Sequence, residues 1–242
     1  MSRSADDTEL FDKAAQQRVL DAIDARQLAD FSSLPKPRRR LSAEFLQQLI
    51  SGSHGAHGEL CCPLRIRGAD IIGPLRPPSA SRDGGRAAVQ FWACNFDSPV
   101  DLSGAEFLVV RFIDCRLPAF IGASLRVSAD LDLSGSQFSG VTDYESELSL
   151  VGSCAIHLNN ARIGGKLDLS STGQSRFVAS GIVRLEGAHV DGDVSFAGAS
   201  LDGCGAPALS ARSVTVGSNV DLRTAFGNRF DAKGEVGFAA AQ

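Results

Sequence analysis

Residues 100–117, VDLSGAEFLVVRFIDCRL, repeat one pattern every five residues. In each group of five residues, a small or medium apolar residue lies two positions before a large one. These pairs are Val100/Leu102, Ala105/Phe107, Val110/Phe112 and Cys115/Leu117. Side chains two positions apart in an extended segment lie on the same face, so both members of each pair are predicted to point inward. The residues between the pairs are mostly polar or small and fit solvent-exposed corners, so the pattern predicts a coil of very short strands.

A longer unit containing the same alternation occurs three times, starting at Leu64, Ile156 and Val183, and a fourth copy starts at Val236. An internal repeat this regular indicates a stacked solenoid. In two copies an extra residue intrudes next to Gly165 or Gly192. Because glycine tolerates positive φ and bulged geometry, these positions are predicted to use one of the two.

The five-residue pattern resembles the pentapeptide-repeat proteins, in which a large apolar residue and a preceding small one fill a four-sided, right-handed parallel β-helix. The phrases GADIIGPL, NARIGGKLDLS and GAHVDGDVSF are also similar to a group of bacterial repeat proteins of unknown role, often labelled membrane-associated oxidoreductases. The resemblance covers roughly residues 42–242. It implies an all-β solenoid, whereas no redox motif in the sequence supports the oxidoreductase label.

The N-terminal part follows a different, helical spacing. A helix is predicted over residues 5–31, ended by Pro35 and Pro37, and a second over residues 42–52. Two amphipathic helices before an apolar coil are expected to cap its first rung. The sequence therefore predicts a helical cap and linker over residues 1–60 and a β-helix domain over residues 61–242.

The composition indicates in which cellular compartment the protein is expected. The chain is 43% hydrophobic, yet no run approaches the roughly 20 apolar residues of a membrane span, and the first residues lack the apolar core of a signal peptide. Cys94 and Cys115 occupy inward small-residue positions, where a free thiol behaves as a small hydrophobe. A cytoplasmic location is expected, without a transmembrane segment.

Charge is divided mildly along the chain. Residues 1–99 hold 13 Lys and Arg against 12 Asp and Glu, and residues 100–242 hold 11 against 16. The coil therefore carries about −5. This is far below the one charge per ~1.7 Å of a DNA duplex, so imitation of DNA is kept only as an alternative function. The basic run Arg38–Arg40 is interpreted as a solvated linker, and no direct binding of nucleic acid is expected.

Few residues have the chemistry of a metal or catalytic site. His54, His57, Cys61 and Cys62 form the single cluster with metal-capable side chains, but adjacent cysteines suit tetrahedral zinc poorly, and no metal site is predicted. The other two histidines, His157 and His189, are expected to face solvent.

Aspartates recur beside the predicted strands and are expected to align in part in an outward column. They are Asp101, Asp132, Asp168 and Asp221. Paired carboxylates hydrolyse sugars, but a residue repeated on every rung more often hydrogen-bonds the backbone of a turn. No nucleophile triad, phosphate loop or dinucleotide fingerprint is present. No catalytic residue and no cofactor is predicted.

The expected function is a non-enzymatic protein-interaction scaffold. Three segments break the repeat, residues 76–88, 140–147 and 170–181, and are predicted to loop out and carry the site for a protein partner of unknown identity. Residues 222–242 are predicted to join two copies as a homodimer through an open end. The alternatives are an inhibitor that imitates DNA and a carbohydrate-active or redox enzyme.

Overall fold

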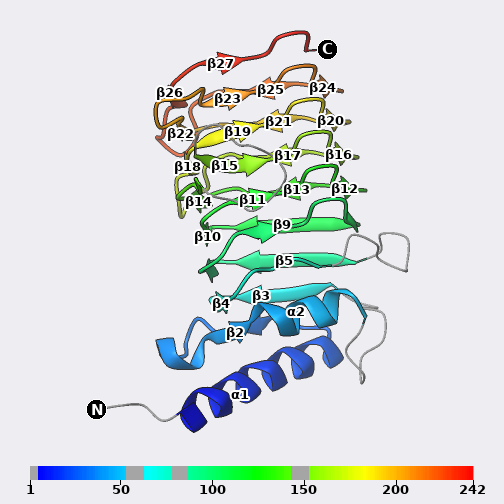
Figure 1. Ribbon diagram of the computed structural model, residues 1–242, viewed down its shortest axis with the longest axis vertical. Coiled ribbons are helices and arrows are strands. Elements are labelled where there is room, and N and C mark those ends of the chain that lie inside the picture. The colour runs from blue at the N-terminus through cyan, green and yellow to red at the C-terminus, as the bar shows by residue number, and fades with distance from the viewer. Residues whose placement is uncertain (1–4, 53–62, 78–86, 143–152, 242) are drawn as a thin grey trace.

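A computed structural model describes residues 5–52, 63–77, 87–142 and 153–241. Within these residues the chain winds through four parallel sheets, here named A to D (Figure 1). The first two turns contribute strands to sheets A and B alone, and from β5 onward the chain visits A, B, C and D in that order. The prediction of a parallel β-solenoid is thereby confirmed. No helix among the described residues is both long and apolar enough to cross a membrane.

The strands of each sheet are short and stack one above another. Sheet A consists of β1 (Ala29–Asp30), β3 (Leu64–Arg67), β5 (Ala88–Trp92), β9 (Val109–Ile113), β13 (Leu131–Asp132), β17 (Leu167–Asp168), β21 (Val194–Ser195) and β25 (Val220–Asp221). Sheet B consists of β2 (Arg40–Ser42), β4 (Asp70–Ile72), β6 (Asn95–Phe96), β10 (Arg116–Leu117), β14 (Gln137–Phe138), β18 (Val178–Ser180), β22 (Ser200–Asp202) and β26 (Asp231–Lys233).

The other two sheets complete each turn. Sheet C consists of β7 (Val100–Asp101), β11 (Phe120–Ile121), β15 (Cys154–His157), β19 (Ile182–Arg184), β23 (Leu209–Ser210) and β27 (Val236–Gly237). Sheet D consists of β8 (Glu106–Phe107), β12 (Arg126–Val127), β16 (Arg162–Ile163), β20 (His189–Val190) and β24 (Thr215–Val216).

The interior is filled by the residues that the five-residue pattern selects. All eight residues of the four pairs between 100 and 117 are buried. The ring of Phe112 stacks on that of Phe91 one turn below, with centroids 4.9 Å apart, and meets Phe120 edge-on at 5.5 Å. Cys94 and Cys115 are fully buried free thiols, as predicted, and burial raises the pKa of Cys115 well above its usual value.

Two helices lie at the N-terminal end of the stack (Figure 1). The helix α2 (Ala43–Ile50) follows Ser42 and buries Phe45, Leu46 and Leu49, which confirms the second predicted helix. The helix α1 (Ala5–Asp24) packs Val19 into the core but ends seven residues earlier than predicted. Arg26 adopts a left-handed conformation with φ of 54°, and the chain then enters β1, whose pairing with β3 replaces the last helical turns.

A short 3-10 turn, η1 (Lys36–Arg38), lies between β1 and β2. Because β1 and β2 pair with β3 and β4, residues 29–30 and 40–42 already belong to sheets A and B.

For Gly165 and Gly192, the positive φ that was one of the two predicted geometries is not found. A Cβ on Gly165 would lie 2.2 Å from Oδ1 of Asp130, and one on Gly192 would lie 2.8 Å from the carbonyl oxygen of Gly165. The absence of a side chain is therefore required because successive turns approach each other closely at this corner, and not because the backbone needs a left-handed conformation.

Candidate functional site

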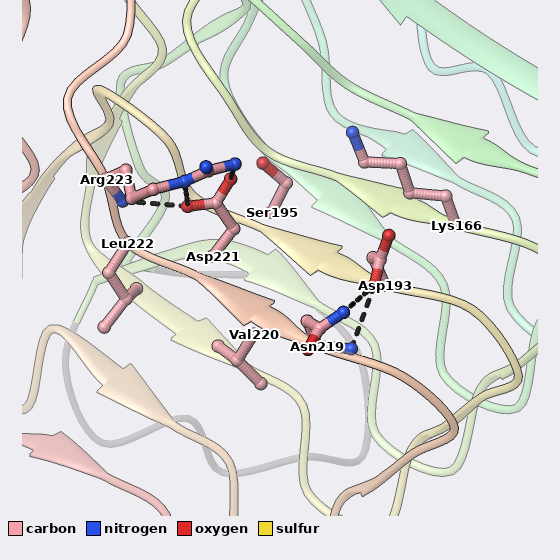
Figure 2. Close-up of a pocket in the computed structure, with 8 residues that line it drawn as sticks. All are labelled: Lys166, Asp193, Ser195, Asn219, Val220, Asp221, Leu222 and Arg223. Carbon is pink, nitrogen blue, oxygen red and sulfur yellow. Dashed lines mark hydrogen bonds and ion pairs between the residues drawn. The ribbon is translucent and has the colours of Figure 1, made fainter.

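A polar cavity of about 490 Å³ lies on the outer side of sheet A near its C-terminal end. Figure 2 shows Lys166 beside Asp193 at one side, the Asp221–Arg223 pair at the other, and Ser195 between them. Ser195 and Asp221, which are paired outward residues of adjacent strands, form part of its lining. Two inward residues also border it, Val220 in β25 and Leu222 directly after that strand.

The charged groups of this cavity already have partners within the chain. Arg223 holds both carboxylate oxygens of Asp221 at 2.9 Å, and these bonds lower the pKa of Asp221 to about 2. Hydrogen bonds from Ser218 and Asn219 lower the pKa of Asp193. A carboxyl group that acts as a general acid needs a raised pKa, so neither group is suited to that task.

The aspartates beside the strands hold the turns that follow them. Oδ1 of Asp101, Asp132, Asp168 and Asp221 each accepts a hydrogen bond of 3.0 Å from the backbone N–H two residues later. Asp132 lies opposite Asp168 in sheet A, and Asp221 continues that column beyond Ser195. Asp101 lies in sheet C. The predicted column is thus confirmed for three of the four residues, and its structural role is the one expected.

Asp132 and Asp168 differ in their electrostatic surroundings. Burial raises the pKa of Asp132, and the charge of Asp168 adds to this effect. Lys166 lies 2.8 Å from Asp168. Asp132 is absent from the cavity lining, so this carboxyl group with its raised pKa lies outside the concave surface.

His157 is buried, and the prediction that it faces solvent is wrong. Its side chain does point outward from sheet C, but it is only 1% exposed. Outward residues of this sheet, Ala119, Ile121 and Cys154, form a second small apolar cluster with Val141, whose backbone pairs with that of Cys154. The outer face of sheet C is therefore covered in this region. His189, in contrast, is half exposed and lies 2.9 Å from Asp191.

The predicted metal-capable residues His54, His57, Cys61 and Cys62 lie outside the described residues. Among the residues that are described, no group of three or more His, Cys, Asp or Glu side chains is placed to hold a metal ion.

The prediction that three segments loop out of the coil can be checked fully for only one of them. Residues 78–86 and 143–152, which include most of the first two, are outside the described residues. The third, residues 170–181, loops out less than predicted, because Phe177 and Ala179 are fully buried and β18 pairs with β14 and β22. Only the turn around residues 172–176 leaves the coil, since Phe177 provides the inward residue that resumes it.

The C-terminal end of the stack is an apolar surface bordered by strand edges. In the described residues, β24, β25, β26 and β27 pair with the turn below and have no strand above them (Figure 1). Val220 and Leu222 are inward residues by register, yet they are 41% and 39% exposed. Val216, Phe230, Val236 and Phe238 are only partly buried here. We name this surface the open end. It includes residues before the predicted range 222–242, because the last turn starts at β24, which is Thr215–Val216.

Comparisons with protein-family models, with curated proteins and with solved structures found no match for this chain.

Proposed function

We propose that this chain is a non-enzymatic protein-interaction scaffold of the bacterial cytoplasm. It is a right-handed, four-sided β-helix of pentapeptide-like repeats that binds a protein partner and forms a homodimer through the open end. Right-handedness follows from the strong preference of parallel strand crossovers for that hand. The helices α1 and α2 act as the cap of the first rung, a role that the burial of Val19 and Leu46 supports.

The observation that carries the proposal is the open end itself. Within the described residues, the outer edges of β24 to β27 pair with no further strand, and they surround exposed apolar side chains such as Val220 and Leu222. Unpaired strand edges readily pair with another chain. A second copy brings an identical edge, and a two-fold contact between identical surfaces closes without further growth.

Imitation of DNA receives less support than scaffolding. A rod that replaces a duplex needs a continuous acidic stripe, but the outward column of sheet D reads Glu106, Arg126, Arg162, His189 and Thr215. In the sheet A column, the two adjacent carboxylates Asp132 and Asp168 follow Arg111 and precede Ser195. Both columns mix the two signs, so neither repeats the charge pattern of a phosphate backbone.

An enzymatic role also receives less support. The polar cavity of sheet A is open, and its carboxylates are engaged by Arg223, Asn219 and the backbone of the turns. Catalytic groups need to be directed at a substrate in a water-excluding site. Groups that already satisfy one another on a flat sheet are better explained as structural.

Light scattering with size separation tests the proposal on the whole chain. We expect the wild type to be a dimer at tens of micromolar and a Val236→Lys, Phe238→Lys variant to be a monomer, because lysine ammonium groups are costly to bury. Leu108→Lys is the matched control, since Leu108 is 46% exposed on a side face of the coil, and it should remain dimeric. A monomeric wild type would contradict the open-end dimer. So would a Leu108→Lys control that becomes monomeric to the same extent as the open-end variant.

A further inference from the structure

The N-terminal half of sheet A contains β5 and β9, the longest strands of the described coil. Each of them has five residues and β3 has four, whereas the later strands of this sheet have two. They are the long arrows in the lower part of the coil (Figure 1). β5 pairs with β3 on one side and with β9 on the other, so the outward side chains of all three share one surface. At ~3.3 Å per residue and ~4.8 Å per strand, this surface measures roughly 16 by 14 Å.

Arginine and apolar side chains are combined on this surface, and no carboxylate is among them. Trp92, the only tryptophan of the chain, lies half-buried here and not in the core. The chain as a whole has a net charge of −4, so a surface with three arginines and no acidic residue departs from the average composition. We name this surface the arginine face; its outward residues are Arg65, Arg67, Ala88, Gln90, Trp92, Val109, Arg111 and Ile113.

The three arginines of this face have no carboxylate partner within the described residues. None of their guanidinium groups forms an ion pair or a hydrogen bond there, and Nε of Arg111 is buried without an acceptor. Asp30 lies opposite Arg67 in the sheet, but its carboxylate accepts the backbone N–H two residues later at 2.8 Å. Asp132 lies opposite Arg111, and its carboxylate is held in the same way at 3.0 Å. The face therefore presents guanidinium donors that a bound carboxylate could satisfy.

The composition of the arginine face is typical of the centre of a protein interface. Tryptophan and arginine are among the residues that most often dominate binding energy. Trp92 and Ile113 lie opposite each other on β5 and β9 and form an apolar strip beside the arginines. Leu108, directly before β9, is 46% exposed and extends the apolar area at the margin. The face covers about a quarter of the ~800 Å² that one partner buries in a standard interface, a share that suits its central residues.

We infer that the arginine face is the docking surface for an acidic segment of the protein partner. This inference rests on the proposed scaffold function and names the surface and the chemistry of the partner. Carboxylates of the segment pair with the three guanidinium groups, whose parent residues are ~7 Å apart along β3 and ~10 Å apart from β3 to β9. An apolar side chain between these carboxylates packs on Trp92 and Ile113.

The sign of the outer face changes one strand beyond Arg111. The same outward column continues with Asp132 and then Asp168. A nucleic acid strand carries one phosphate every ~3.4 Å, so a strand that follows this column would bring phosphates against both carboxylates. A protein segment needs only a few acidic residues and can change its sequence where the column becomes acidic. An acidic protein segment therefore fits this face better than a nucleic acid does.

Peptide selection followed by fluorescence tests this assignment on the whole chain. Short random peptides displayed on phage are selected against the wild type, and binding of the synthetic peptides is read from the emission of Trp92, which reports from within the face. We expect the selected peptides to carry acidic residues around an apolar one and to change this emission. An Arg65→Glu, Arg67→Glu variant should weaken their binding at least about tenfold, because like charges that face each other across an interface repel.

The matched control reverses two other exposed arginines and gives the same net charge. It is Arg116→Glu with Arg162→Glu, on sheets B and D, and it should bind the peptides as the wild type does. A second variant, Arg65→Gln with Arg67→Gln, removes the two charges without placing new carboxylates beside Asp30. It should also weaken binding, and its melting temperature should match that of the wild type.

Three results would overturn the inference in different ways. Peptides that bind the wild type and the Arg65, Arg67 variants equally would place the partner site elsewhere, and the scaffold proposal would stand. A selection that yields no peptide binding the wild type would contradict both proposals. A single-stranded oligonucleotide that changes the Trp92 emission at lower concentration than the peptides would identify the partner of this face as a nucleic acid and not a protein.

Discussion

His157 and Arg184 lie opposite each other on the adjacent strands β15 and β19. The imidazole is almost completely buried, and neither of its ring nitrogens has a hydrogen-bond partner among the described residues. Burial, followed by the positive charge of Arg184, lowers the pKa of His157, while Glu186 and Asp101 act weakly in the opposite direction. The folded protein therefore holds this histidine neutral.

This pairing predicts a loss of stability on mild acidification. Below pH ~6.5 the unfolded chain binds a proton at His157 that the folded chain does not, so the free energy of unfolding falls as pH falls, by at most about 1.4 kcal/mol per pH unit. Chemical denaturation at pH 7 and 5.5 measures it. His157→Gln should flatten the pH dependence, and the exposed control His189→Gln should not. An unchanged dependence in the His157 variant would contradict this assignment.

The phenylalanine stack predicts where the core is most sensitive. Phe112→Ala should lower the free energy of unfolding by ~3–5 kcal/mol, because it removes a fully buried ring that packs on Phe91 and Phe120. Glu106→Ala is the control. Its exposed ion pair with Arg126, at 3.3 Å, contributes ~0–1 kcal/mol. Urea denaturation compares them, and a larger loss in the Glu106 variant would require a different inward register.

The close corner at Gly165 predicts a strong effect from one methyl group. Gly165→Ala brings a Cβ against the Asp130 carboxylate that accepts the backbone N–H of Lys166 at 2.9 Å. Overpacking of this kind costs ~1–3 kcal/mol. In Gly173→Ala the new Cβ would make only ordinary contact, 3.7 Å from the Phe226 ring. Melting temperatures that fall equally in the two variants would show that close approach is not the constraint.

The aspartate turns predict a graded response at Asp168. Asp168→Asn keeps an oxygen that can accept the Ser170 N–H but loses the charge beside Lys166. Asp168→Ala loses both, and should cost about 1–2 kcal/mol for the unsatisfied turn. We expect the asparagine variant to be clearly more stable than the alanine variant in thermal unfolding. Equal losses would assign the role of Asp168 to its ion pair and not to the turn.

Several features were predictable from the sequence because they depend on local geometry. The two-residue spacing of Val110 and Phe112 defines an inward face, since side chains alternate in any extended segment. The burial of Cys94 and Cys115 follows from the same rule. The turn role of Asp168 was also predictable, because a carboxylate next to a corner can reach the N–H two residues later.

Other features depend on which segments the folded chain brings together. His157 occupies an outward position, and nothing local indicates that the sheet C face around it is covered. The length of α1 is limited by the pairing of β1 with β3, a contact between segments more than thirty residues apart. Gly165 is constrained by Asp130, which lies one turn below it in the coil.

The sequence by itself determined the alternation of inward and outward residues and the repetition of turns, because these result from backbone geometry within a few residues. The tertiary structure decided how one turn fits the next: which outward residues become buried, where turns approach too closely for a Cβ, and which strand edges stay unpaired at the open end. These outcomes depend on distances between residues far apart in the sequence, which are fixed only when the whole coil is stacked.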